Sequence, residues 1–143
     1  MSALEQIQQD AISALKAGDR TRAGALRLVA SELQKAAKAG DADEVAVLQR
    51  ERKRRIEAAE AYREAGRDDL AATEEGEAEV IEAYMPEQLS DDALRAIVGD
   101  AVARLGTVSQ ADMGKVMAQV MPEVKGRADG KRVSAAVRET LSA

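Results

Sequence analysis

The chain has 143 residues, with 21 Lys or Arg against 26 Asp or Glu, and no histidine, cysteine, phenylalanine or tryptophan. Without cysteine and histidine it has no disulfide, no thiolate zinc site and no Ser/His or Cys/His pair for acyl transfer. Tyr62 and Tyr84 are the only aromatic side chains, so the core must be aliphatic. The apolar runs are shorter than the roughly 20 residues of a membrane span, and the N-terminus lacks a signal-peptide pattern. We therefore expect a cytoplasmic protein without membrane contact.

Apolar residues recur at helical spacing, and helix-favouring residues dominate, which predicts an all-α protein. Capping residues, glycines and two prolines divide the chain into seven helices. The predicted caps include Ser2, Asp68 or Asp69, Ser90 and Asp129. In chain order we expect helices over residues 2–17, 19 or 21 to 40, 43 to just before 66, 68 or 69 to 84, 90–106, 109–122, and from 129 to near the end.

Two features predict how these helices are grouped. Only AGRDD separates the third helix from the fourth, so these two should form a long antiparallel hairpin. The segment MPEQLSDD separates long charged helices from shorter ones with a compact apolar set. We predict an N-terminal four-helix domain over residues 1–88 and a small C-terminal three-helix domain over residues 89–143.

The net charge of −5 conceals a strong segregation of charge along the chain. Residues 20–55 carry ten Lys or Arg against five acids, and residues 57–92 carry 13 acids against two arginines. Residues 125–143 return to five cations against two acids. An acidic chain of this kind can still bind an anionic partner, because a local patch sets the field that the partner meets.

The basic run RERKRR resembles a nucleic-acid patch, but on a helix its cations spread around most of the circumference. Arg52 falls on an apolar stripe that we expect to comprise Val45, Leu48, Ile56, Ala59 and Tyr62. Arg52 should therefore face the acidic fourth helix, at Glu74 and Glu77. An internal ion-pair network is the favoured interpretation, and some outward arginines stay open to a partner.

Two other patterns favour structural roles. Met113, Met117 and Met121 recur every four residues on one helix face, and we interpret them as core filling, with a partner-binding surface as the alternative. The acidic stretch EEGEAEVIE suggests a metal site, but carboxylate-bridged iron sites in helical bundles also use histidine. We expect no metal and no cofactor.

The segment VKGRADGKRV, residues 124–133, looks at first like a phosphate-binding loop for nucleotides. It fails that pattern because Gly126 and Gly130 are separated by three residues rather than four, and Arg132 replaces the Ser or Thr that binds magnesium. What remains is a tight loop that places cations at the start of a helix, where amides and the helix dipole favour an anion. We expect contact with a phosphate backbone, and a connecting turn with incidental charge is the alternative.

Four segments occur in the order and spacing of the YqeY-like proteins, the GatB/YqeY family, which the chain resembles over essentially its whole length. They are LRLVASELQKA, VLQRERKRRIEAAEAYREAGRDDL, EAYMPEQLSDDAL and DMGKVMAQVMPEVKGRADGKRV. The most distinctive match extends from Met113 to Lys131. The resemblance implies a C-terminal domain similar to the tail of GatB, a component of the glutamine-dependent aspartyl/glutamyl-tRNA amidotransferase. It also implies tRNA, or a tRNA-bound enzyme, as the partner.

Of the amidotransferase, the chain matches only the GatB tail, and it lacks the activating and amidase domains of that enzyme. The family-level association with carbon–nitrogen ligase activity, with glutamine as amido-N-donor, therefore does not imply catalysis here. We expect a non-catalytic accessory protein of tRNA metabolism. An adaptor that docks on an amidotransferase or an aminoacyl-tRNA synthetase, through the hairpin or the methionine face, is the alternative. The expected RNA-binding residues are Lys115, Lys125, Gly126, Arg127, Gly130, Lys131 and Arg132.

Overall fold

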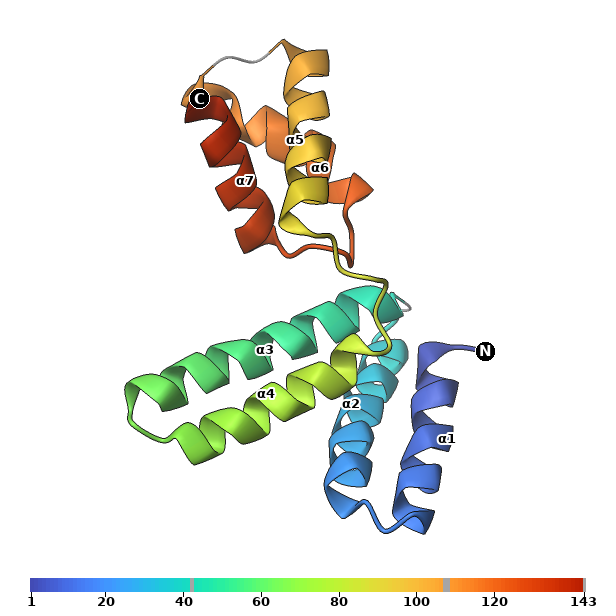
Figure 1. Ribbon diagram of the computed structural model, residues 1–143. Coiled ribbons are helices and arrows are strands. Elements are labelled where there is room, and N and C mark those ends of the chain that lie inside the picture. The colour runs from blue at the N-terminus through green and yellow to red at the C-terminus, as the bar shows by residue number, and fades with distance from the viewer. Residues whose placement is uncertain (42, 107–108, 143) are drawn as a thin grey trace. The chain divides into compact units, whose positions relative to one another are not determined.

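The structure, a computed structural model, describes residues 1–41, 43–106 and 109–142, and all its regular elements in these ranges are helices (Figure 1). The all-α prediction is confirmed. The chain divides into two compact units, Met1–Pro86 and Glu87–Ala143. The division into domains over residues 1–88 and 89–143 stays a prediction. No helix in the described ranges is both long enough and apolar enough to cross a membrane.

Within the described ranges, the N-terminal unit contains four α-helices and the C-terminal unit three, with one short 3₁₀ helix before the sixth (Figure 1). In chain order they are α1 (Ala3–Lys16), α2 (Arg20–Lys38), α3 (Glu44–Glu64), α4 (Asp68–Glu82), α5 (Asp91–Leu105), η1 (Gln110–Asp112), α6 (Met113–Glu123) and α7 (Gly130–Ser142).

The predicted caps explain most of the helix starts. The side chains of Ser2, Asp19, Asp43 and Ser90 each accept a hydrogen bond from the backbone N–H three residues later. Each satisfies one of the amides that lack a partner inside the helix. The start of α1 gains a second cap from another helix, because the Glu44 carboxylate accepts hydrogen bonds from the N–H groups of residues 3 and 4, at 3.1 and 2.9 Å.

One predicted cap and one predicted helix start are wrong. Arg67 rather than Asp68 or Asp69 occupies the N-cap of α4 and makes no side-chain cap bond, and the two aspartates lie in the first turn. They still face the positive end of the helix dipole, which explains their placement. The sixth helix begins at Met113 instead of Ser109, after η1, and includes Pro122 in its last turn, where a missing N–H breaks few bonds.

In the N-terminal unit, α1 packs beside α2, and α3 and α4 form the predicted antiparallel hairpin (Figure 1). The apolar stripe of α3 differs from the prediction: Val47, Leu48 and Ala59 are buried, whereas Val45 and Ile56 are only partly buried. The difference arises because α3 packs against both α2 and α4, and this turns its buried side toward Glu51. The core cluster consists of Ile7, Ala11, Ala14, Ala23, Leu26, Val29, Ala30, Leu33, Val47, Leu48 and Ile81.

The predicted ion-pair network lies at the seam between α3 and α4. Arg55 pairs with Glu51 at 2.8 Å on its own helix and with Glu77 of α4 at 3.3 Å. Arg52 pairs with Glu82 at 3.5 Å instead of the expected Glu74 or Glu77. Glu51 is only 3% exposed, so Arg55 neutralises a carboxylate that water cannot reach.

Tyr84 follows α4, and its hydroxyl donates a hydrogen bond to the Asp10 carboxylate on α1. Burial of the ring and this bond to a negative charge raise the pKa of Tyr84 to about 12. The ionised phenolate is therefore disfavoured in the folded unit.

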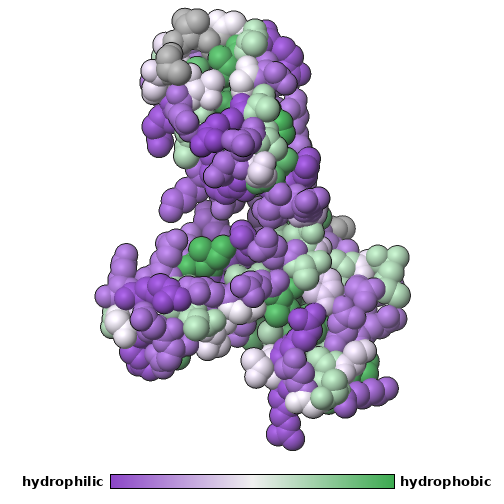
Figure 2. Space-filling model, in the orientation of Figure 1, coloured by the Kyte–Doolittle hydropathy of each residue, from purple (hydrophilic) through white to green (hydrophobic). Residues whose placement is uncertain are grey.

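The C-terminal unit encloses an aliphatic core between α5, α6 and α7. Met113, Met117 and Met121 are partly buried and pack against this core, which confirms their predicted role as core filling. Hydrophilic side chains cover much of the face shown in Figure 2, with small hydrophobic areas between them. The buried residues of the unit are Leu89, Leu94, Val98, Ala101, Val116, Val120, Val124, Ala128, Val133, Ala136, Val137 and Leu141.

Replacement of Arg55 by alanine should lower the free energy of unfolding by about 2–3 kcal/mol, because it leaves the buried Glu51 carboxylate with one solvent-facing partner. The matched control is Arg54→Ala. Arg54 also pairs with Glu51, but its side chain is 64% exposed, so we expect a loss below about 1 kcal/mol. Urea unfolding monitored by tyrosine fluorescence measures the stability loss of each variant, since Tyr62 and Tyr84 both lie in the N-terminal unit. Equal losses would contradict a special role for the buried pair.

Tyr84 should also make the stability of this unit sensitive to alkaline pH. Because its pKa is raised from 10 to about 12 in the folded state, its contribution is complete below pH 10 and is lost as the pH rises through about 12. In a tyrosinate absorbance titration, Tyr84→Phe should remove an ionisation near pH 12, and Asp10→Asn should move that ionisation to lower pH. An unchanged titration in Asp10→Asn would contradict the contribution of the Asp10 charge.

Candidate nucleic-acid interface

The connection between α6 and α7 alternates buried and exposed residues. Val124 and Ala128 are fully buried, and Gly126 between them is also buried, whereas Lys125 and Arg127 are exposed. Gly126 has a φ of 76°, a left-handed conformation that glycine adopts without the penalty of a Cβ atom. The apolar side chains thus hold the turn on the core and leave its cations outside. We call residues 124–131 the basic turn.

The segment before α5 is hydrogen-bonded along the basic turn. The Leu89 N–H donates to the Arg127 carbonyl at 2.8 Å, and the Gln88 side-chain amide donates to the Gly126 carbonyl at 2.8 Å. Arg127 Nε in turn donates to the Glu87 carbonyl at 3.4 Å. These bonds fix the backbone of the turn. Gln88 is not among the predicted site residues, because no local pattern signals a partner 38 residues away.

Arg132 has a structural role that was not predicted from the sequence. Its Nη2 donates to the Leu89 carbonyl at 2.7 Å and lies 3.0 Å from Asp91 Oδ1. The side chain is one-third exposed, and its guanidinium connects the first turn of α7 to the start of α5. Arg132 is therefore engaged by its own unit, and this limits its capacity to bind an external phosphate.

A carboxylate of the protein itself, that of Asp129, already lies at the start of α7. The Asp129 carboxylate accepts a hydrogen bond from the Arg132 N–H at 2.8 Å, which confirms the predicted cap. Gly130 is the first residue of α7, its φ is not positive, and a Cβ atom there would meet nothing within 4 Å. The turn therefore requires glycine at position 126 and not at 130. Lys131 is exposed in the first turn of the helix.

Lys115 does not join the other predicted residues. It lies in the first turn of α6, 3.9 Å from Asp112, whereas the basic turn follows the other end of this 11-residue helix, about 13 Å further along its axis. Just before Lys115, the Gln110 amide donates to the Arg138 carbonyl at 3.0 Å, near the last turn of α7. The structure thus groups six of the seven residues and places Lys115 near the opposite end of α6 from the basic turn.

The charges of the two units differ. Residues 87–143 contain eight Lys or Arg and eight Asp or Glu, whereas residues 1–86 contain 13 and 18, which accounts for the net charge of −5. The C-terminal unit thus has no net positive field to reinforce its basic turn. Attraction of an anion there depends on short-range contacts and should be strongly screened by salt.

These observations define an all-helical protein of two units, the second of which presents a basic turn before its last helix. A model of the Yqey-like protein family matches residues 4–141, so the chain belongs to this family. The resemblance seen in the sequence is confirmed.

The chain is also similar to a fungal protein, "Altered inheritance of mitochondria protein 41, mitochondrial" of Pyrenophora tritici-repentis (strain Pt-1C-BFP). The two are 26% identical over 148 residues, an alignment that covers 98% of this chain and 81% of that protein. The similarity therefore extends over both units.

The two glycines of the basic turn should respond differently to substitution. Gly126→Ala places a Cβ atom on a left-handed backbone and should lower the free energy of unfolding by about 1–2 kcal/mol. Gly130→Ala has helical backbone and open space, so stability should be unchanged or higher by up to about 1 kcal/mol. Thermal unfolding by far-ultraviolet circular dichroism measures both. Equal losses would show that both positions need glycine.

Proposed function

We propose that this protein is a non-catalytic accessory protein that binds structured RNA, with tRNA as the expected partner, through the basic turn. The observation that carries the proposal is the exposure of Lys125, Arg127 and Lys131 on a backbone held in place by buried neighbours and hydrogen bonds. Cations on a fixed backbone lose little conformational freedom when they contact phosphates. The resemblance of the C-terminal segment to the GatB tail, inferred from the sequence, supports the same partner class, and the Yqey-like family model matches the segment that carries it.

The composition favours recognition of a duplex backbone over single-stranded bases. Single-stranded RNA is bound by stacking on aromatic side chains, and the chain has only two tyrosines, neither in the C-terminal unit. Phosphate contacts give affinity without base specificity. We therefore propose binding that depends on RNA shape and falls steeply with salt.

The proposed role involves no bond-making step. The chain contains no histidine or cysteine, and no group of three acidic side chains in the described ranges is arranged to hold a metal ion. Glutamine-dependent amidation by the purified protein would contradict this part of the proposal. We propose the cytoplasm as the setting; the similar fungal protein is named as mitochondrial, and tRNA is present in both compartments.

Simultaneous replacement of Lys125, Arg127 and Lys131 by alanine should weaken tRNA binding at least tenfold. It should also lower the slope of log K against log salt by about 2 to 3, since each phosphate contact contributes roughly 0.9. Filter binding or a mobility shift at several salt concentrations measures both quantities.

The matched control replaces Lys16, Lys35 and Lys53 by alanine, which removes the same charge from exposed sites outside the basic turn. We expect its affinity for tRNA to stay within about twofold of the wild type. At moderate salt, charges far from the bound RNA are screened, so the change in net charge alone has little effect on affinity. Equal weakening in both triple variants would reject the basic turn as the site. Absence of any tRNA binding by the wild-type protein would reject the RNA function itself.

A further inference from the structure

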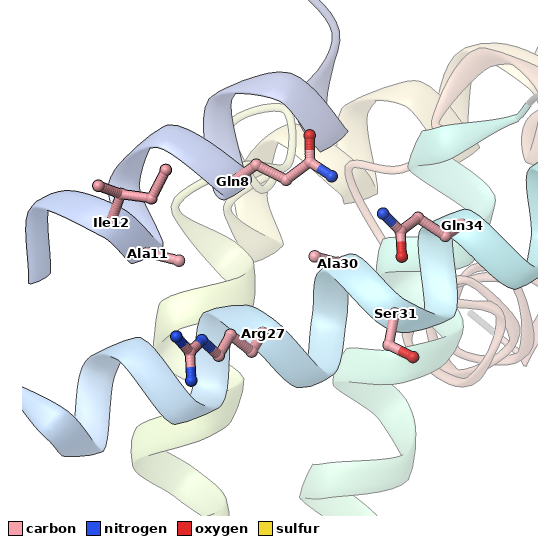
Figure 3. Close-up of a pocket in the computed structure, with 7 residues that line it drawn as sticks. All are labelled: Gln8, Ala11, Ile12, Arg27, Ala30, Ser31 and Gln34. Atoms are coloured by element: carbon pink, nitrogen blue, oxygen red, sulfur yellow. The ribbon is translucent and has the colours of Figure 1, made fainter. Parts of the chain in front are cut away.

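The α1–α2 pair of the N-terminal unit carries an open groove of about 490 Å³ that the proposed RNA contact does not involve (Figure 3). Ala11 of α1 and Ala30 of α2 lie between the two helices, and both are less than a tenth exposed. Gln8 and Gln34 extend from opposite helices into the space between them. Small side chains in the centre and long polar ones at the side thus give the groove an apolar floor and a hydrogen-bonding wall.

One rim of the groove is apolar and faces water. Ile12, which lines the groove, is 56% exposed, and Leu15, one turn further along α1, is 46% exposed. Full burial of such a side chain contributes about 1.5–3 kcal/mol, so a partner that covered both would gain substantial binding energy. Large exposed apolar side chains that lie together mark interaction surfaces more often than isolated ones do.

The other rim is cationic. Arg27 lines the groove, and Arg20 and Lys38 lie seven and eleven positions from it on α2, spacings that return to the same side of a helix. All three are exposed. The residues that line the groove include no carboxylate. The groove therefore complements a ligand that is apolar on one side and negatively charged beside it.

We propose that this groove binds an amphipathic α-helix of another protein, with an acidic flank beside its apolar face. A third helix fits between two packed helices by setting its side-chain ridges into their groove. Its apolar residues would cover Ala11, Ala30 and the exposed Ile12, and its carboxylates would pair with Arg27 and the cations beside it. The proposal concerns the N-terminal unit alone and does not depend on RNA binding by the basic turn.

Two other occupants fit the groove less well. An RNA backbone would satisfy the cations but would leave Ile12 and Leu15 without apolar partners. A second copy of the chain, packed groove to groove, would bring a second Arg27 and no carboxylate of the groove into the interface, so the cations of both copies would lack partners of opposite charge. An interface that gathers unpaired like charges disfavours association.

The test uses two synthetic helical peptides with leucine and alanine on one face and either glutamate or lysine along the flanks. Each is titrated into the isotope-labelled full-length protein, and amide signals are followed by NMR. The glutamate peptide should bind saturably and shift the signals of Gln8, Ile12, Arg27 and Ser31, whereas the lysine peptide should not bind. Failure of the glutamate peptide to bind, shifts elsewhere, or equal binding of the lysine peptide would overturn the proposal.

Two substitutions with one matched control localise the effect. Arg27→Glu and Ile12→Asp should each weaken binding of the glutamate peptide at least tenfold, since each removes one half of the complementarity. Leu28→Asp is the control. Leu28 lies on α2 beside Arg27 and is 54% exposed, but it does not line the groove, so binding should change less than twofold. Far-ultraviolet circular dichroism verifies that all three variants fold. An equal effect of Leu28→Asp would overturn the assignment to the groove.

Two further measurements identify the alternative occupants. Stronger shifts of the same amides by a tRNA transcript than by the glutamate peptide would assign the groove to nucleic acid and overturn the proposal. Concentration-dependent self-association in sedimentation, abolished by Ile12→Asp, would assign it to a second copy and also overturn it. Loss of RNA binding in the basic-turn variant leaves the groove proposal unaffected, so failure of either proposal is recognised separately.

Discussion

The lack of large aromatic side chains in the cores constrains both units. Every buried apolar residue in the described ranges is alanine, valine, leucine or isoleucine. Such side chains let helices approach closely, but each buries little area, and aliphatic packing alone specifies helix register poorly. Register is therefore set to a large extent by polar contacts between distant segments. The Glu44 cap on α1, the Arg55 pairs at the α3–α4 seam and the Arg132 contact with Leu89 are examples.

These polar contacts divide the cations of the chain into two groups with different consequences. Arg52, Arg55 and Arg132 are partly or largely buried and hold elements of their own unit together. Arg27 and Lys131 are exposed and lie on separate units. The density of positive charge along the sequence does not distinguish the groups, since the richest run, residues 50–55, supplies Arg52 and Arg55 to the internal seam and also contains the exposed Arg54. Both surfaces that we propose for partners lie where the charge density along the sequence is lower.

Local chemistry explains what could be predicted from the sequence. Caps such as Ser2 and Ser90 act within three residues, so they mark helix starts reliably, and the short hairpin loop brings the basic and acidic runs together. The structural contact of Arg132 with the Leu89 carbonyl was not predictable, because this acceptor lies 43 residues away in the sequence. The separation of Lys115 from the basic turn, and the groove beside Ile12, likewise depend on which helices pack together and in which direction.

The hydrogen bonds of residues 87–90 have a consequence for any exchange of this unit between proteins. By secondary structure alone, the C-terminal unit begins with α5 at Asp91. The carbonyls of Glu87 and Leu89 and the side chain of Gln88, however, complete the basic turn and the Arg132 contact. A transplanted piece that began at Asp91 would carry a loosened turn, even with all three helices intact. A piece for recombination or grafting must therefore include the backbone carbonyls that accept these hydrogen bonds. It begins at Glu87, before the first helix of the unit.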